Sequence, residues 1–279
     1  MQSCLKRLAM IGISLIYAVI HRLWRGIARA AGGVPPPAPP VVMTYHGVLT
    51  EDIPRFEEQM RHLCRNATTV FADEARGAND RPRVAVTVDD AFQSVFDHAL
   101  PVMARHGIPA TIFAPTGFLG SAAGWMLRAD GAAYAPAVAS ADVLASADRR
   151  QVKVASHTVT HPYLSLLQPS DVRHELAASK RTLEEISGEP VRMLSLPYGS
   201  CTSSVLEEAR AAGYEQVFAN VPVGRGKPSL AGLVGRINVT PRDWPLEFRL
   251  KARGAYDWLA LAIPAKRVAL ALVRRNITP

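Results

Sequence analysis

The sequence predicts an α/β fold built on a mainly parallel sheet. Short apolar runs typical of buried strands alternate along the chain with segments whose apolar residues recur every three to four positions, as in helices. Three of these helical segments end at a glycine, which closes a helix without a steric penalty. Strands of a parallel sheet are covered by helices on both faces, so continuous apolar strands point to this class.

The chain has 279 residues, which suits one large domain with short additions. It is 48% hydrophobic and 20% charged, a composition typical of a packed core rather than of disorder. We expect an apolar and basic anchor or signal segment at 1–31, a proline-rich linker at 32–40, the folded domain at 41–245, and a basic amphipathic segment at 246–279. The alternative for the last segment is a final core helix followed by a solvated end.

The first segment contains an apolar run at 8–20 that follows two basic residues. Thirteen residues are fewer than the roughly 20 that a straight transmembrane helix needs, and they match the apolar region of a signal peptide. Arg22 and Arg25 follow the run, however, which suits an uncleaved helix at a membrane interface. An uncleaved anchor, a cleaved signal peptide and a soluble core helix are all compatible with this segment.

Positive charge is concentrated at the two ends of the chain. The net charge is +8, residues 1–30 and 246–279 each carry +5, and the middle is −2. A nucleic-acid enzyme carries its basic patch on the working domain, so this distribution indicates an anionic membrane surface as partner and no nucleic acid. Three cysteines, without a Cys-x-x-Cys pair, give no disulfide framework.

Each element of the domain follows from its local pattern. Apolar runs predict strands, and helical spacing predicts helices between them, the second interrupted by Pro101. The expected strands are 41–45, 83–88, 110–115, 152–156, 192–196 and 215–220, and the expected helices are 54–66, 94–107, about 171–187 and 204–212.

Polar motifs follow four of these strands. They are MTYHG at 43–47, TVDDAF at 87–92, SHTVTH at 156–161 and LPYGS at 196–200. Because the carboxyl ends of parallel strands share one edge of a sheet, the motifs converge on one rim. Two histidines four positions apart can point at one ion, and with a carboxylate they form a metal site with open positions.

These motifs, in this order, resemble those of the NodB-like polysaccharide deacetylases, carbohydrate esterase family 4. The family patterns are T-F-D-D-G, H-[ST]-x-x-H and R-x-P-Y-G, and the resemblance covers roughly 41–245. It is closest to the branch that opens on a Tyr-His strand end and includes poly-N-acetylglucosamine deacetylases. The resemblance implies a distorted (β/α) barrel of about seven strands, and a hydrolase that removes N-acetyl groups from sugars with a divalent metal.

The resemblance also implies roles for individual residues. Asp90, His157 and His161 align with the metal ligands, for Zn²⁺ in the first place and Co²⁺, Ni²⁺ or Mn²⁺ as alternatives. Asp89 aligns with the general base, and Tyr198, preceded by Pro197, aligns with the residue whose backbone N–H holds the oxyanion.

This chain departs from the family pattern in three places. Ala91 replaces the glycine of the first motif, a modest change if its φ is negative. Ser195 replaces the arginine that braces the catalytic aspartate, and Arg236 is a candidate to supply that charge from another strand. No histidine occurs after His174, so the usual C-terminal general acid is missing.

Two further residues are candidates for the site. His46 ends the first strand, and because the first and last strands of a closed barrel are neighbours, it can take the place of the missing acid. A structural hydrogen bond is the alternative role for His46. Trp244 offers an apolar face that can stack on a sugar or pack in a turn.

The sequence therefore predicts de-N-acetylation of N-acetylhexosamine units in a surface polysaccharide or a lipid-linked sugar precursor. The expected location is the bacterial inner membrane, or the periplasm or exterior if the first segment is a signal peptide. Two alternatives are a non-catalytic glycan-binding or scaffold protein of the same fold, and a metal amidohydrolase that acts on a non-sugar amide.

Overall fold

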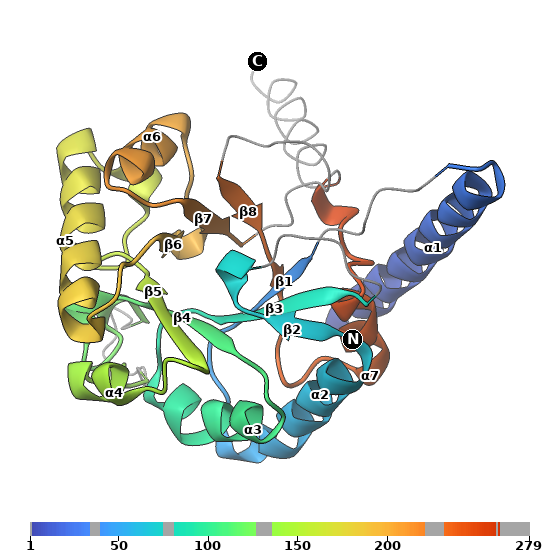
Figure 1. Ribbon diagram of the computed structural model, residues 1–279, viewed down its shortest axis with the longest axis horizontal. Coiled ribbons are helices and arrows are strands. Elements are labelled where there is room, and N and C mark those ends of the chain that lie inside the picture. The colour runs from blue at the N-terminus through green and yellow to red at the C-terminus, as the bar shows by residue number, and fades with distance from the viewer. Residues whose placement is uncertain are drawn as a thin grey trace.

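A nine-stranded parallel sheet forms the centre of the molecule (Figure 1). The computed structural model describes residues 2–33, 40–74, 81–126, 136–220, 232–260 and 262. The strands follow the order β8-β7-β6-β5-β4-β3-β1-β9, and β2 pairs with the start of β3. They are β1 Val41–Tyr45, β2 Thr68–Val70, β3 Arg83–Val88, β4 Ala110–Ala114, β5 Val152–Ser156, β6 Met193–Ser195, β7 Gln216–Ala219, β8 Leu233–Gly235 and β9 Ile237–Asn238.

The last two strands bring the edges of the sheet together. β8 pairs with β7 through Val217 and Leu233, while β9 pairs with β1 through Met43 and Ile237. Arg236 alone separates the two strands, so they act as one bent strand that nearly closes the barrel. Counted in this way, β1, β3, β4, β5, β6, β7 and β8–β9 give seven positions, which confirms the predicted distorted barrel of about seven strands.

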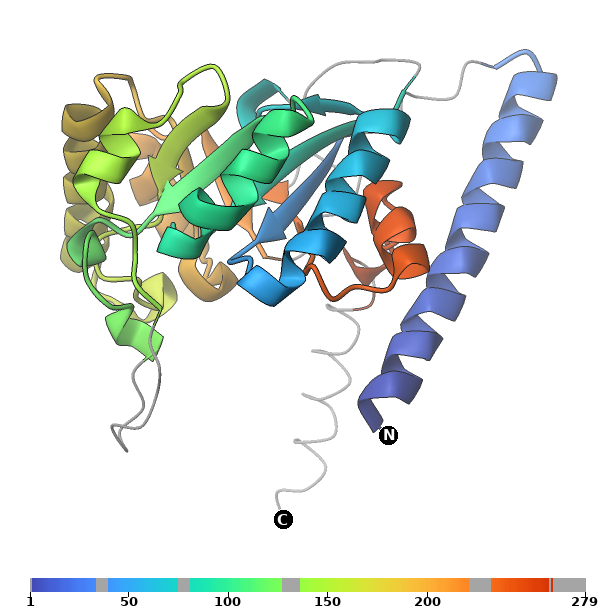
Figure 2. The same ribbon diagram turned by 90° about the horizontal axis from the view of Figure 1, so that it is seen from below.

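Helices pack around the outside of the sheet (Figures 1 and 2). Their buried faces repeat every three to four residues, as in Phe56, Met60 and Leu63. The predicted helix at 94–107 is divided into a π-helix, Val95–Ala99, and a short α-helix, because Pro101 lacks an N–H to donate. The α-helices are α1 Gln2–Ala30, α2 Ile53–Asn66, α3 Leu100–Arg105, α4 Ala141–Ser146, α5 Pro169–Ser187, α6 Ser203–Ala211 and α7 Pro245–Ala252.

Two apolar layers hold the fold together. The larger lies between the sheet and the helices, where alternate strand residues such as Val84 and Val86 are buried. The smaller fills the barrel and contains Phe113 and Phe218, whose ring centroids are 5.2 Å apart. The barrel interior is therefore packed with side chains, and functional groups are available only at its ends.

The N-terminal helix α1 lies beside the barrel and contacts α7 and the turns that follow it (Figure 2). Ile11 packs into an apolar cluster with Leu250 and Tyr256, and Trp258 donates a hydrogen bond of 2.9 Å to the hydroxyl of Ser14. By length and composition, 4–30 is sufficient to cross a membrane, a test that a signal sequence also passes. Most of the predicted linker and most of the segment 246–279 lie outside the described residues.

Candidate active site

Adjacent strands in register deliver the motif residues to one rim. Tyr45 of β1 pairs with Val88 of β3, and Ser156 of β5 pairs with Leu194 of β6. The residues that follow these strands are therefore level with one another at the carboxyl ends of the sheet. The structure brings together there the predicted residues His46, Asp89, Asp90, His157 and His161, with Pro197 and Tyr198 in the turn after β6.

Three buried ligand groups meet at this rim. The carboxylate oxygen Oδ1 of Asp90 lies 3.5 Å from Nε2 of His157 and 3.3 Å from Nε2 of His161. Oδ1 of Asp90 and Nδ1 of His161 are buried and have no hydrogen-bond partner among the described residues. An orphaned carboxylate oxygen is costly unless something binds it, so Asp90 and the two imidazoles that face it form a candidate cation site.

The three ligand atoms lie within 4.8 Å of one another, and the two distances measured from Asp90 fit a small divalent ion. Ligands about 2.0–2.1 Å from a tetrahedral zinc ion lie roughly 3.3–3.4 Å from one another, close to both distances measured from Asp90. His157 donates from Nδ1 to the backbone carbonyl of Ser195 at 2.8 Å, which leaves a lone pair on Nε2. Burial lowers the pKa of His157 and so favours the neutral imidazole that a metal requires.

A buried carboxylate on α5 shapes the loop that carries the two histidines. Glu175 accepts hydrogen bonds from the backbone N–H groups of Val159 and Thr160, at 2.7 and 2.9 Å, and from the hydroxyl of Thr160. The loop needs this support because Thr158 and His161 both have positive φ, 68° and 57°. Glu175 was not predicted from the sequence, where its only signal is a position on the buried face of α5.

Asp89 is held by an arginine from the closing strand. Nη1 and Nη2 of Arg236 donate to the two oxygens of Asp89 at 2.7 Å each, and both side chains are fully buried. Ser195 accepts a hydrogen bond of 2.7 Å from Arg236 and donates one of 3.3 Å to Asp89. The structure therefore places Arg236 and Ser195 together at the position where the family pattern has one arginine.

Asp89 is ionised in this environment. Burial by itself would raise its pKa, but the charge of Arg236, together with its hydrogen bonds and the nearby His157 and His46, holds the pKa well below its usual range. Bidentate pairing to arginine is the strongest hydrogen-bonded form of a carboxylate, which makes burial of both charges possible.

The backbone of the first motif is not in the conformation that would make Ala91 a neutral replacement. Asp90 and Ala91 have positive φ values of 69° and 47°. This left-handed region costs a residue with a Cβ roughly 1–2 kcal/mol, and glycine avoids the cost. The replacement of glycine by Ala91 would be modest only with a negative φ, and φ is positive here. Ala91 therefore adds local strain next to Asp90.

An aromatic wall covers the triad on one side. The ring of Trp125 stacks on His161 with centroids 4.4 Å apart, and the ring of Tyr198 meets His161 edge-on at 4.8 Å. Tyr163 stacks on Tyr198 at 3.9 Å, and both tyrosines are about half exposed. Tyr198 has a φ of 58°, so it sits at a sharp turn. Trp125 and Tyr163, which reach the rim from segments outside the strands and α-helices, were not predicted from the sequence.

Of the two remaining candidates, His46 lies at the rim near Asp89, and Trp244 lies apart from it. His46 follows β1 and is partly exposed, and the N–H of Asp89 donates to the carbonyl of Tyr45 immediately before it. Trp244 precedes α7, where its ring contacts the guanidinium of Arg7 at 4.9 Å rather than the aromatic wall.

Comparison with known proteins identifies the family. The polysaccharide deacetylase family model matches residues 76–217. YxkH of Bacillus subtilis, which bears that family's name, is 23% identical over 217 residues, 74% of this chain and 73% of its own length. A chitooligosaccharide deacetylase of Sinorhizobium fredii is 28% identical over 179 residues, 60% of this chain and 71% of its own.

A solved structure supports the same relationship. IcaB from Ammonifex degensii superposes with a TM-score of 0.65 at 26% identity, over 76% of this chain and 96% of that one. A closed parallel sheet, the strand-end motifs and the family match agree, and the chain therefore belongs to the polysaccharide deacetylases, hydrolases that act on amide bonds.

Proposed function

We propose that this protein is a metal-dependent de-N-acetylase of N-acetylhexosamine units in a surface polysaccharide or a lipid-linked sugar precursor. The observation that carries the proposal is the unpartnered Oδ1 of Asp90 between two imidazole nitrogens, with an ionised Asp89 beside it. A divalent ion held by Asp90, His157 and His161 would supply Lewis-acid polarisation of the amide carbonyl and of a water molecule. Zinc is the first candidate for such a ligand set.

Asp89 accepts the proton of the attacking water in this proposal. Its oxygen Oδ2 already accepts hydrogen bonds from Arg236 and Ser195, whereas Oδ1, among the side chains that the structure describes, accepts one, from Arg236. A carboxylate oxygen has two lone pairs, so Oδ1 keeps one for the water proton. Arg236 fixes the orientation of this lone pair and keeps Asp89 off the metal.

The other rim residues complete the hydrolysis. The backbone N–H of Tyr198, presented by the turn after Pro197, holds the negative charge that develops on the carbonyl oxygen. His46 follows β1, the strand next to the one that carries Asp89. It donates a proton to the sugar nitrogen as the C–N bond breaks and acetate leaves. The exposed rings of Tyr163 and Tyr198 offer an apolar face to the sugar.

The N-terminal helix supports a location at a membrane surface. One stripe of α1, Arg7, Ile11 and Ser14, faces the domain, and Arg22 and Arg29 continue it at the same spacing. The opposite face is broad, apolar and exposed, which suits a helix that lies in the membrane interface while its other side holds the domain. This face contains Leu5, Leu8, Ile16, Val19, Ile20, Leu23, Trp24 and Ile27.

Acetate release tests the proposed reaction. The full chain, purified in detergent, is assayed on N-acetylglucosamine oligomers before and after chelation, and its bound metal is measured. We expect acetate release to depend on the metal and to fall at least a hundredfold in Asp89→Asn with little change in metal content. The control Asp142→Asn alters an exposed acid of α4 and leaves both quantities unchanged.

Two other results would replace the proposal. Metal binding without acetate release from any acetylated glycan would favour a glycan-binding protein. Release of acetate only from non-sugar amides would favour a different amidohydrolase.

A further inference from the structure

A second site lies between α2 and α7, away from the rim. A cavity of about 980 Å³ runs between α2, α7 and the loop that precedes α7, and none of the triad residues lines it. Seven arginines line this cavity against two acidic residues, Glu58 and Asp243. Asp243 is already neutralised by Lys251 at 2.7 Å, so the cavity is strongly positive.

Three of the seven arginines have acidic partners. Arg7 pairs with Glu247, Arg61 with Glu57, and Arg242 with Asp52. The other four are exposed and form no ion pair or side-chain hydrogen bond with any residue that the structure describes. These four, called the groove arginines below, are Arg55, Arg65, Arg249 and Arg253.

The groove arginines come from the two helices that border the cavity. Arg55 and Arg65 belong to α2, while Arg249 and Arg253 lie at the end of α7. His62 of α2 contacts Phe248 of α7. Its pKa is lowered, first by partial burial and then by the charges of Arg249 and Arg253, so these two cations lie close to α2.

This arrangement is unfavourable without an anion. Arg249 and Arg253 are four residues apart, a spacing at which like charges on a helix repel. The helix dipole favours cations at the C-terminal turn, but Arg55 lies in the first turn of α2, where the dipole disfavours it. Guanidinium groups bind phosphate oxygens in pairs, so a phosphate group offsets these repulsions.

The floor of the cavity is fixed before any ligand binds. The amide of Gln59 donates to the backbone carbonyl of Thr240 at 2.9 Å and accepts from the hydroxyl of Tyr45 at 2.8 Å. Phe248 is buried and meets the ring of His62 edge-on at 5.9 Å. The groove arginines are therefore attached to rigid elements, which lowers the entropic cost of binding.

We propose that the groove arginines bind the phosphate group of an anionic membrane lipid. Arg7 of α1 lines the same cavity, so the groove arginines lie beside the helix whose opposite, apolar face is exposed and suited to a membrane interface. The lipid source rests on the membrane position proposed for α1, whereas the phosphate site rests on the groove arginines alone. Two arms of one experiment separate these two parts.

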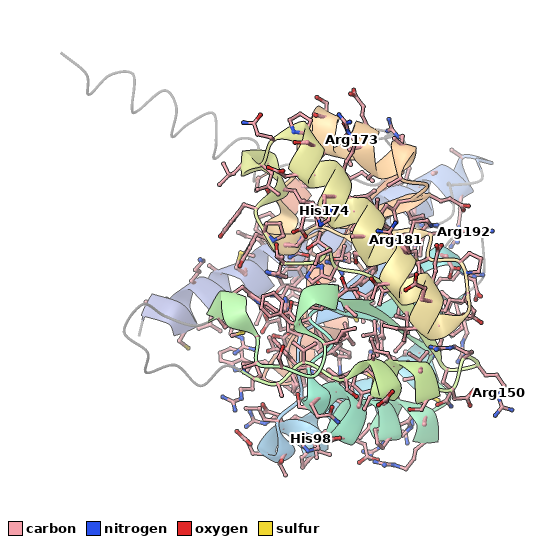
Figure 3. All side chains as sticks on the ribbon, turned by 90° about the vertical axis from the view of Figure 1, so that its left-hand side faces the viewer. His98, Arg150, Arg173, His174, Arg181 and Arg192 are labelled. Carbon is pink, nitrogen blue, oxygen red and sulfur yellow. The ribbon has the colours of Figure 1, made fainter. Side chains whose placement is uncertain are left out.

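The first arm measures vesicle binding of the full chain by sedimentation, with phosphatidylcholine vesicles alone or with phosphatidylglycerol added. The test variant changes all four groove arginines to glutamine. The control variant changes Arg150, Arg173, Arg181 and Arg192, which lie on the face of the molecule formed by α5 and its neighbours (Figure 3). Both variants lose the same charge, and neither alters the rim, so acetate release should be unchanged in both.

An arginine near an anionic surface contributes about fivefold to binding. We therefore expect the test variant to lose at least tenfold in affinity for phosphatidylglycerol vesicles, and the control variant to lose less than threefold. Binding to phosphatidylcholine vesicles, which reports on α1, should be equal in all three proteins. Equal affinities of the test and control variants for phosphatidylglycerol vesicles would overturn the lipid site.

The second arm titrates the same three proteins with inorganic pyrophosphate, followed by calorimetry. Weak binding, at millimolar concentration or above, supports a lipid as the source of the phosphate. Micromolar binding that only the test variant loses, with vesicle affinity unaffected, would show a site for a soluble phosphate and overturn the lipid source. Failure of the wild type to bind either kind of vesicle would overturn the lipid source together with the membrane position of α1.

Discussion

Arginine has opposite environments at the rim and in the α2–α7 groove. Arg236 is fully buried, and its donors are directed at Asp89, Ser195 and Asn220. Arg249 and Arg253 are exposed and unpaired among the described residues. Arg236 fixes the orientation of Asp89, whereas Arg249 and Arg253 are available to bind an anionic ligand. The same residue type thus indicates a structural brace or a binding site according to its burial and partners.

Substitutions at Arg236 and Arg249 test this contrast most strongly. Arg236→Met leaves a buried charge on Asp89, and we expect a loss of about 3–5 kcal/mol in unfolding free energy. Arg249→Met removes an exposed charge and should change stability by less than about 0.5 kcal/mol. Urea unfolding followed by circular dichroism measures both. Similar losses in the two variants would show that Arg236 is not a structural brace.

Metal removal should affect the rim and spare the groove. At a free metal concentration one hundred times its Kd, binding adds about 2.7 kcal/mol of stability. We expect chelation to lower the Tm by several degrees in the wild type and in Arg249→Met. His161→Ala, which removes one ligand, should show almost no change on chelation. A full thermal shift in that variant would exclude His161 as a ligand.

Arg7 connects α1 to the groove and gives a pH-dependent test. It donates to Glu247 at 2.5 Å, and Arg7→Gln should cost about 1–2 kcal/mol at pH 7. Burial raises the pKa of Glu247, but the charges and hydrogen bonds of Lys251 and Arg7 lower it by more. The pKa of Glu247 is therefore below its usual value. A depressed pKa contributes stability above the ordinary value of about 4.3. That contribution is lost as the pH falls through the folded value.

The difference in stability between wild type and Arg7→Gln should therefore be complete at pH 7 and narrow below about pH 4. Urea titrations at pH 7, 5 and 3.5 measure it. Arg22→Gln, further along the same stripe of α1, serves as the control and should show no such trend. A difference in stability that stays constant with pH would show that Arg7 does not stabilise the protein through Glu247.

The smallest expected effect concerns Ala91. Ala91→Gly removes roughly 1–2 kcal/mol of left-handed strain and adds about 0.5–1 kcal/mol of unfolded-state entropy. We expect a net gain of at most about 1 kcal/mol in urea unfolding. Ala209→Gly, in the helix α6, should lose about 1 kcal/mol instead. A loss at both positions would mean that the Cβ of Ala91, which is buried, packs more favourably than its φ is strained.

The central strands were predictable because burial on both faces makes them continuously apolar. β1, β3 and β5 begin and end where the sequence pattern places them. β2, β8 and β9 were missed, since two or three residues cannot form a recognisable pattern. The helix break before Pro101 was anticipated as a kink, but the π-helix that accommodates it was not.

Some residues of the candidate site were likewise predictable from local motifs, and others only from contacts distant in sequence. Asp90, His157 and His161 are visible as spaced motifs, because each lies beside its strand end. Arg236 was a candidate only because a charge was missing elsewhere, and its two contacts with Asp89 span 147 positions of sequence. Glu175, Trp125 and Tyr163 carry no local signature, and only tertiary packing brings them to the rim.

The bent strand β8–β9 also couples closure of the barrel to completion of the site. The residue that bridges its two halves is the counter-ion of Asp89, so the site and the barrel are completed in the same step. A nascent or truncated chain that ends before this strand has every motif residue yet keeps Asp89 uncompensated. Loss or displacement of this strand should thus abolish the proposed activity and open the barrel together, because one residue serves both.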